Sequence, residues 1–485
     1  MANAARESEE RSNAGAANVV VAPAILAVIQ SARTPIGVPR RADAPKSLPG
    51  VEGVWWAIHG LFGVLRRGVA YSVENGLERF GEVYRAPFIG NSVVAIWDAD
   101  EIHKILKNED HAWSTAMGWH ALMFEGLDPR SGNIGALLTL DFDDHRVARK
   151  LVQPAFTLNA IKGYLAVAER RFDRAVPAWI ERRRVSFKSE IRALLASVAG
   201  EIFTGIQDSA KIAALDRALS DFWHGMMAIT RNPWLSTTFR RSRRGFETLR
   251  TSFLELVPER RKQGGDDLFS LMCRVEDRDG LTDEAVVRVF LTVMFGAFDT
   301  TSAAMTSMAY LLAKHPEWQE RLRDEAQRIP PGGLDVSTMK SMRTLEWVWK
   351  ETMRLMPVSS FVPRWALREV EVCGHALRAG TLVAPMAGAI GRHPKWWKEP
   401  LKFDPERFSP ERAEDQQHPG ISNPFGAGAH ACVGMQLANL EMKAFWHKFL
   451  GACRFSLEKD YEARHTHTPM GTVSGKVSLR LEPIR

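Results

Sequence analysis

The sequence of 485 residues contains only four cysteines, Cys273, Cys373, Cys432 and Cys453. They are scattered along the chain, with no CxxC pair and no spacing typical of a metal finger. This pattern excludes a disulfide scaffold and a zinc-binding module, and it fits a reducing compartment.

The N-terminal region lacks an apolar run long enough to span a membrane. Residues 19–29 are apolar, but Pro23 interrupts them, and a spanning helix needs about 20 apolar residues. The preceding RESEER segment lacks the basic character of a signal peptide. We interpret residues 1–45 as a disordered tail, with weak membrane contact as the alternative. No linker or repeat follows, so we expect residues 46–485 to form a single domain.

A strong excess of either charge is also missing, because 64 Lys and Arg residues against 57 Asp and Glu residues give a net charge of +7. This balance does not specify nucleic acid, but it fits docking of an acidic partner protein. Residues 232–250 combine arginines with aromatics, yet no nucleic-acid-binding motif surrounds them. We interpret that segment as a solvated helix and loop, with weak contact to an anionic membrane as the alternative. We expect a cytoplasmic monomer without a nucleic-acid partner, and peripheral membrane association is the alternative location.

Helical periodicity dominates the rest of the sequence. Residues 190–206 place apolar residues at three-and-four spacing, and the longest helical pattern runs from residue 281 to His315–Pro316. Its middle is apolar on nearly all sides, which predicts a helix through the core. Strand-like alternation is confined to short segments such as residues 369–386. The sequence therefore predicts a mainly α fold with a small β portion.

The loop 424–434 (PFGAGAHACVG) places Cys432 directly before a helical pattern. A helix N-terminus favours a thiolate, because its dipole and free N–H groups stabilise negative charge. Gly426, Gly428 and Gly434 permit positive φ and let the backbone approach a flat group closely. A buried structural thiol in a turn is the alternative interpretation.

The order of residues in this loop resembles the haem-binding loop of the cytochrome P450 family, the haem-thiolate monooxygenases. The residues that carry the resemblance form an F-G-x-G-x-H-x-C-x-G pattern: Phe425, Gly426, Gly428, His430, Cys432 and Gly434. The resemblance implies the fold of that family, with haem b between a long distal helix and the proximal cysteine loop. It further implies that the Cys432 thiolate ligates the haem iron, Phe425 packs near the ring, and His430 reaches a propionate.

Two further segments match the family in the expected order along the chain. His145 and Arg149 lie one helical turn apart, and Arg364 precedes a strand. By themselves His145 and Arg149 fit a solvated helix face. The resemblance implies that all three side chains bind haem propionates, as charge-assisted recognition requires.

A third match concerns a structural network. Glu351 and Arg354 are three residues apart on a predicted helix and can pair. A buried pair needs further partners, and Arg407 in the FDPERF segment resembles the second arginine of the family. We expect these three residues to support the fold on the proximal side of the haem.

The middle of the longest helix carries polar residues that an apolar core tolerates only with partners or a function. Asp299 is such a residue, and Thr300 can bond back to the carbonyl four residues earlier. A structural kink with a solvated aspartate is the alternative. The resemblance implies proton delivery by Asp299 and a hydrogen bond from Thr300 to bound O2. Ala297 replaces a glycine that the family often carries.

The resemblance implies an oxidoreductase that inserts one atom of O2 into an organic substrate. Met- and Phe-rich segments suggest a lipophilic substrate of terpenoid, steroid or fatty-acid type. The predicted pocket residues are Met117, Phe295, Phe298, Phe361 and Met470. The alternatives are a haem-thiolate enzyme that works without a reductase, such as a peroxygenase, isomerase or dehydratase, and a non-catalytic haem sensor or carrier.

Electrons are expected from NAD(P)H through a separate reductase and a ferredoxin or flavodoxin. Basic residues near Cys432 could attract such an acidic partner. The candidates are Arg146, Lys150 and Lys443.

Overall fold

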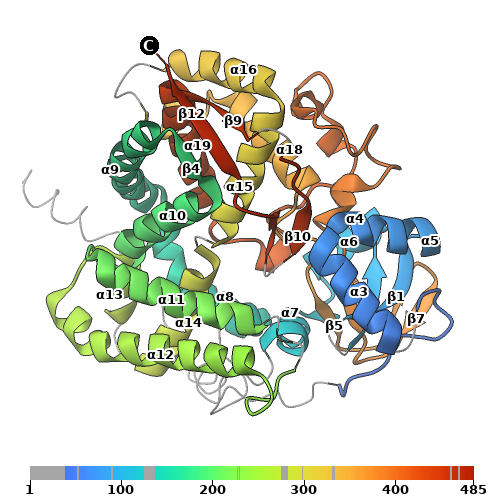
Figure 1. Cartoon of the computed structure of the whole chain (residues 1–485). Coiled ribbons are helices and arrows are strands. Elements are labelled where there is room, and N and C mark those ends of the chain that lie inside the picture. The colour runs from blue at the N-terminus through green and yellow to red at the C-terminus, as the bar shows by residue number, and fades with distance from the viewer. Residues whose placement is uncertain are drawn as a thin grey trace, which may run out of the picture.

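The computed structural model of the chain describes residues 39–484, apart from 52–53, 89–90, 125–136, 227, 229, 275–281, 298, 330–333, 459–460 and 468–469. Most described residues lie in helices, and the strands form a few small sheets. This confirms the predicted mainly α fold. Figure 1 shows the sheet-containing part beside the larger helical part.

The helical part surrounds a core of apolar side chains drawn from most of its helices. The longer helices of the chain are α3 (Val54–Arg67), α6 (Ala99–Lys107), α8 (Phe142–Val152), α9 (Leu158–Arg182), α10 (Phe187–Thr204), α11 (Ser209–Met226), α12 (Thr237–Gln263), α14 (Asp283–Ala297), α15 (Asp299–Lys314), α16 (Pro316–Gln327), α18 (Arg343–Leu355) and α19 (Met435–Ala452). Shorter α-helices are α4 (Val69–Ser72), α5 (Glu78–Phe80), α7 (Thr115–Trp119), α13 (Leu268–Cys273) and α17 (Val336–Met339).

Short 3-10 and π-helical turns complete the helical elements. The π-helices are η2 (Val73–Leu77) and η3 (His120–Phe124). The 3-10 turns are η4 (Leu137–Thr139), η5 (Gln153–Phe156), η7 (Ala389–Arg392), η8 (Pro405–Phe408), η9 (Glu414–Gln416) and η10 (Gly428–His430).

Helices α14 and α15 run through the interior, as the apolar pattern of 281–318 predicts. Every residue from Thr301 to Leu312 is buried. The stretch Asp283–Lys314 is long and apolar enough to cross a membrane, but 71% of its most apolar window is buried inside the protein. Burial of this kind is what a core helix shows.

The ends of these helices follow from local chemistry. Thr282 Oγ1 accepts the N–H of Ala285 at 3.3 Å and caps α14. Helix α15 stops at Lys314, and Pro316 begins α16, because proline disfavours helical geometry in the residue before it. Gly205, with φ of 66°, ends α10 in the left-handed conformation.

Aromatic packing fixes α19, the helix that follows the cysteine loop. Phe445 makes an edge-to-face contact with Phe172 of α9, with ring centroids 5.6 Å apart. Trp446 stacks on Phe187 of α10 with the centroids 6.0 Å apart. Such contacts stabilise beyond the area they bury, so the helix that carries the loop is held firmly against α9 and α10.

The strands of the described residues form four small sheets. The largest has the order β1 (Val83–Phe88), β2 (Asn91–Ile96), β8 (Leu382–Pro385), β5 (Arg364–Ala366) and β3 (Trp113–Ser114). The others pair β4 (Arg184–Ser186) and β9 (Cys453–Leu457) with β12 (Ser478–Pro483), β6 (Val370–Val372) with β7 (His375–Leu377), and β10 (His465–His467) with β11 (Gly471–Val473). Gly374, between β6 and β7, has a φ of 78°, which glycine adopts readily.

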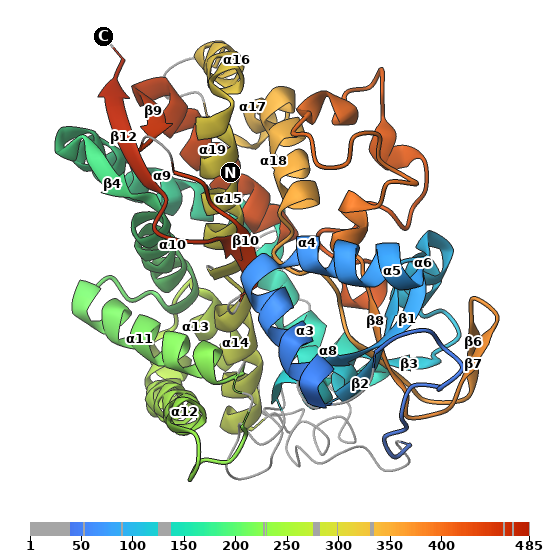
Figure 2. The same ribbon diagram turned by 45° about the vertical axis from the view of Figure 1, so that its right-hand side comes forward.

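The folded part of the chain begins before residue 46. The N–H of Ala42 donates to the carbonyl of Gly380 at 2.9 Å, and Ala44 and Leu48 are buried. The predicted boundary of the tail at residue 45 is therefore too late, because these residues find hydrogen-bond and apolar partners on the sheet-containing part. Residues 1–38 lie outside the described part of the chain. Figure 2 shows the first described segment, which begins at residue 39, passing beside β6 and β7.

Candidate active site

The loop 424–434 has the geometry of a tight backbone platform. Gly426 and Gly428 have φ of 70° and 68°. A Cβ on Gly428 would lie 2.3 Å from the carbonyl oxygen of Leu106, so that position requires glycine. The N–H of Cys432 donates to the carbonyl of Phe425 at 2.8 Å, which closes the loop, and α19 begins three residues later.

The thiol of Cys432 faces an internal cavity, so its accessible surface is exposed to that space. Burial raises its pKa, while N–H groups of Gly434 and Met435 and the charge of Arg149 act in the opposite direction. The predicted helix N-terminus is therefore present, but burial is the largest influence on the free thiol. A cation bound at the sulfur would be needed to make the thiolate its normal state.

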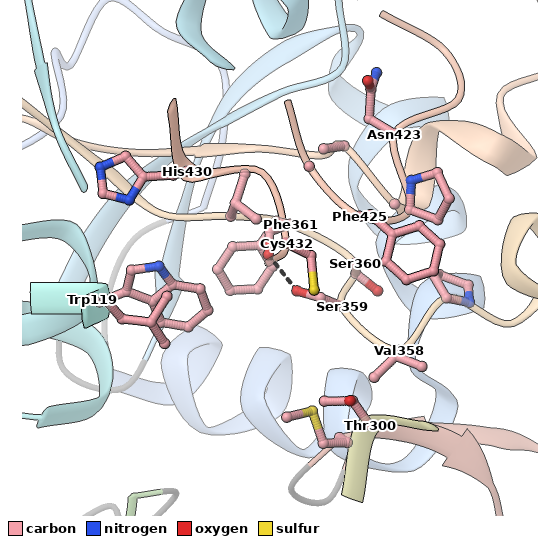
Figure 3. Close-up of a pocket in the computed structure, with 18 of the residues that line it drawn as sticks. Trp119, Thr300, Val358, Ser359, Ser360, Phe361, Asn423, Phe425, His430 and Cys432 are labelled. Atoms are coloured by element: carbon pink, nitrogen blue, oxygen red, sulfur yellow. Dashed lines mark hydrogen bonds between the residues drawn. The ribbon is translucent and has the colours of Figure 1, made fainter. Parts of the chain in front are cut away.

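The cavity has a volume of about 480 Å³ and separates the cysteine loop from the central helices. In Figure 3, Thr300 lies across the space from Cys432, while Trp119 and Phe361 form parts of its wall. Gly296 and Ala297 line it beside Thr300. Small residues at this point leave room above the sulfur.

Basic side chains gather along one edge of the cavity, and they include all four residues predicted for that role. His145 and Arg149 come from α8, Arg364 from the start of β5, and His430 from the loop. The rings of His145 and His430 lie with centroids 3.8 Å apart. Arg149 donates to the carbonyls of Ala429 and Ala431 at 3.0 and 2.7 Å. These contacts attach α8 to the cysteine loop.

The surroundings of Arg364 indicate that the basic edge of the cavity binds an anion. Its side chain is buried, and its Nη1 donates to the carbonyl of Pro363 at 2.9 Å. Its Nε has no hydrogen-bond partner among the described residues. Burial lowers the pKa of Arg364 to about 10, and it lowers the pKa of His145 to about 4. A buried guanidinium of this kind needs an anion, and the two carboxylates of a haem would meet that need at this edge.

The residues present therefore fit a haem group. The thiol of Cys432 faces the cavity, Phe425 and Gly434 line it, and the basic edge lies to one side. In this arrangement Cys432 would ligate the iron, and Arg149 and Arg364 would bind the propionates.

Asp299 lies differently from the sequence-based expectation. It does not line the cavity; its Oδ1 accepts from Nε of Arg192 at 2.7 Å. Nη1 of the same arginine donates to Asp216 of α11 at 2.7 Å. Burial raises the pKa of Asp299, and the charge of Arg192 opposes that effect. Nothing in the local sequence revealed this partner, because Arg192 is distant in the chain.

Thr300 does line the cavity, and its Oγ1 donates to the carbonyl of Gly296 at 2.7 Å. The back-bond is the one that the sequence predicts. The acid and the alcohol of the predicted pair thus lie on different sides of α15.

The predicted structural network is formed. Arg354 donates to both carboxylate oxygens of Glu351 at 2.6 and 2.8 Å, and Nε of Arg407 lies 3.6 Å from Glu351. All three side chains are buried. Arg354 also donates to the carbonyls of Gly391 and Pro400 at 2.6 and 2.7 Å, so the network ties the following loop to α18.

The predicted substrate residues divide into three groups. Phe295, Phe361 and Met470 line the cavity. Met117 does not; it packs against the apolar cluster of the sheet. Phe298 lies outside the described residues.

Other residues line the cavity too, and the four apolar ones fall in the segments 114–127 and 221–229, which are among the Met- and aromatic-rich segments that suggest a lipophilic substrate. These other lining residues are Trp119, Met123, Phe124 and Trp223, together with the polar residues Tyr71, Asn75 and Tyr84. Trp223 of α11 stacks on Phe295 with ring centroids 3.8 Å apart. Aromatic residues are common in any core, so no sequence signal distinguished these from core positions.

A cysteine loop that faces a long buried helix across a cavity, with a basic edge for carboxylates, defines the class of haem-thiolate proteins. The chain belongs to the cytochrome P450 family, whose sequence model matches residues 49–482. It is therefore a haem-dependent oxidoreductase that incorporates oxygen from O2.

Named relatives support this family assignment. The chain is 33% identical over 355 residues to cytochrome P450 136 of Mycobacterium tuberculosis, covering 72% of each chain. It is 32% identical to cyclooctat-9-en-7-ol 5-monooxygenase of Streptomyces melanosporofaciens, covering 62% of this chain and 68% of that one. Ent-kaurenoic acid oxidase 1 of Arabidopsis thaliana is 26% identical, with 77% and 78% covered.

Solved structures show the same fold. The retinoic acid-bound cyanobacterial protein CYP120A1 matches with a TM-score of 0.76 and 23% identity, covering 84% of this chain and 93% of that chain. The haem domain of cytochrome P450DA matches with a TM-score of 0.76 and 20% identity, covering 92% and 98%.

Proposed function

We propose that the chain is a monooxygenase that inserts one oxygen atom from O2 into a lipophilic substrate of terpenoid, steroid or fatty-acid type. The cavity lining carries this proposal. Apart from Cys432 and the basic edge, its described lining residues are apolar or neutral and polar, and none is acidic. Such a lining favours an apolar ligand oriented by a few polar contacts. Two relatives are named for lipophilic substrates, cyclooctat-9-en-7-ol and ent-kaurenoic acid, which supports the same class.

We infer the role of each residue from its position in the site. When bound, the haem supplies the activation of O2. Cys432 would hold the iron, while His145, Arg149, Arg364 and His430 would hold the carboxylates. Thr300 faces the cavity, where its hydroxyl oxygen can accept a hydrogen bond, and it can donate one there once it leaves the carbonyl of Gly296. Asp299 would supply protons from behind α15 once Arg192 releases its carboxylate.

Electrons would come from NAD(P)H through a separate reductase and a ferredoxin or flavodoxin. We further propose that the chain works as a cytoplasmic monomer and that one domain carries the activity.

Two measurements on the purified haem protein test this function. A carbon monoxide difference spectrum should show thiolate ligation, and Cys432→Ser should lose that signature while it retains the fold by circular dichroism. A binding screen should then give spin-state shifts with terpenoids, steroids or fatty acids. Shifts that occur only with small, charged compounds would contradict the proposed substrate class.

A haem-thiolate enzyme that needs no reductase is the second candidate. The ion pair of Asp299 with Arg192 favours it, because the acid does not face the cavity in this structure. Turnover with hydrogen peroxide alone, at a rate that NAD(P)H and redox proteins do not exceed, would support this candidate and contradict the first.

A further inference from the structure

Asp141 stands at the N-cap position of α8, where an aspartate side chain commonly accepts a hydrogen bond from the first turn of the helix. Its own side chain makes no hydrogen bond to the N-terminus of α8. Only its backbone carbonyl serves that helix, by accepting the N–H of His145 at 3.0 Å. The carboxylate is therefore free to serve another element.

That element is α7, which forms part of the cavity wall. Oδ1 of Asp141 accepts the N–H groups of Thr115 and Ala116 at 2.8 and 3.1 Å, and Oδ2 accepts the hydroxyl of Ser114. The carboxylate is mostly buried, with 15% of the side chain exposed. Charge-assisted bonds in a buried setting are about twice as strong as neutral ones, so this carboxylate anchors the first turn of α7.

The same carboxylate lies within the basic edge of the cavity. Oδ1 is 3.8 Å from Nε2 of His430, and the charges of Asp141 and Arg364 affect each other's pKa. Helix α7 also packs closely on the strand that begins at Arg364. A Cβ on Gly118 would lie 2.8 Å from the carbonyl oxygen of Pro363.

We propose that Asp141 is a positioning residue that fixes the substrate-facing wall, α7 with η3, relative to the cofactor-binding edge. Thr115 and Trp119 of α7 and Met123 and Phe124 of η3 line the cavity. Through Asp141 that wall is connected to His430 and to the start of α8. The proposal depends on the proposed function for the identity of the cofactor, but the anchoring of α7 does not.

Amide hydrogen exchange on the haem protein tests the anchoring without any activity. In Asp141→Ala, the N–H groups of Thr115 and Ala116 should exchange about tenfold or more faster, because they lose their acceptor. Amides in the last two turns of α8 should be unchanged. Asp141→Asn retains one acceptor oxygen and should restore most of the protection. Exposed Asp143 lies on the same helix and pairs with Arg146, so Asp143→Ala is the matched control.

A pair of probes tests the effect on the cavity. Imidazole and 4-phenylimidazole ligate iron in the same way, but 4-phenylimidazole carries a phenyl group that would extend into the cavity. Asp141→Ala should weaken 4-phenylimidazole binding about tenfold and leave imidazole binding within twofold, and Asp141→Asn should lie close to wild type. If Asp141→Ala matches wild type in both exchange and phenylimidazole affinity, or if Asp141→Asn is as defective as alanine, the positioning role is wrong. A protein without a thiolate-type carbon monoxide spectrum would contradict the proposed function, and the exchange result would still decide the anchoring.

Discussion

At the residue scale, Thr300 is the polar group best placed to influence the chemistry, because it faces the cavity across from Cys432 (Figure 3). We expect Thr300→Ala to reduce the fraction of consumed electrons that appears in product by about tenfold, since one proton-handling group is lost. The remaining electrons should appear as hydrogen peroxide. The measurement is NAD(P)H consumed against product and peroxide formed.

A matched control exists on the same helix. Thr306 makes the same type of back-bond, to the carbonyl of Ser302 at 2.6 Å, but does not line the cavity. Thr306→Ala should therefore leave coupling unchanged. Equal coupling in Thr300→Ala and wild type would contradict the role of Thr300.

Substitution of Arg192 should change the free energy of unfolding and its dependence on pH. Arg192→Gln leaves the carboxylates of Asp299 and Asp216 without their shared cation, which should cost about 2 kcal/mol of unfolding free energy at pH 8. Burial already raises the pKa of Asp299. Protonation therefore stabilises the folded variant, and its deficit should shrink as the pH falls towards about 4.

Urea unfolding at several pH values measures this deficit. Arg170→Gln removes a more exposed arginine from its ion pair with Glu201 and serves as the control, with a small effect. The same Arg192→Gln variant should move the alkaline limb of the turnover profile to higher pH, because Asp299 then retains its proton longer. A deficit that does not change with pH would show that Arg192 does not act through the carboxylates.

At this scale the sequence predicted which residues lie near the cavity more often than it predicted where each side chain points. The spaced pattern around Cys432 predicted the loop through its resemblance to the haem-binding loop of the family. The sequence could not show that the carboxylate of Asp299 accepts a hydrogen bond from Arg192, or that the carboxylate of Asp141 accepts hydrogen bonds from α7. Both facts depend on contacts between residues far apart in the chain, and no local pattern encodes them.

At the element scale, α19 contains a second unusual acid, Glu441. It is buried, Oε2 has no hydrogen-bond partner among the described residues, and burial raises its pKa to about 8. An acid whose pKa is raised on folding is stabilised in its neutral form. The contribution of neutral Glu441 to the free energy of unfolding is fully present below about pH 4.5. It is lost as the pH rises through about 8.

Glu441→Gln should therefore make the protein more stable than wild type above pH 8, by about 2 kcal/mol or more, with little difference near pH 4.5. Thermal unfolding across this pH range measures the effect. Glu255 is exposed on α12, and Glu255→Gln should not change the pH dependence. A parallel pH dependence in Glu441→Gln and wild type would mean that Glu441 is ionised or paired in solution.

The elements themselves were the most predictable level of the structure. Helix periodicity and the end signal at Pro316 locate α14 to α16, because these signals act within a few residues. The side-chain environment of single positions was less predictable. Met117 packs on the sheet, and Lys443 is buried, with its Nζ donating to the carbonyl of Met339 and to Glu346.

At the scale of the whole molecule, the burial of Lys443 removes it from the predicted docking surface for a redox partner. Two of the three candidates remain exposed. Arg146 and Lys150 lie one turn apart on the outer face of α8, whose inner face carries His145 and Arg149. A partner bound there would lie behind the basic edge and close to the cysteine loop.

We expect Arg146→Glu combined with Lys150→Glu to slow reduction by an acidic ferredoxin about tenfold at low salt, because charge complementarity raises the rate of encounter. The difference should disappear near 1 M salt, where charges are screened within about 3 Å. Stopped-flow reduction under carbon monoxide measures the rate. Arg240 and Arg244 are exposed with the same spacing on α12, and their reversal to glutamate is the matched control. Equal slowing by both double variants would indicate a general effect of net charge, and no slowing by either would place the docking surface elsewhere.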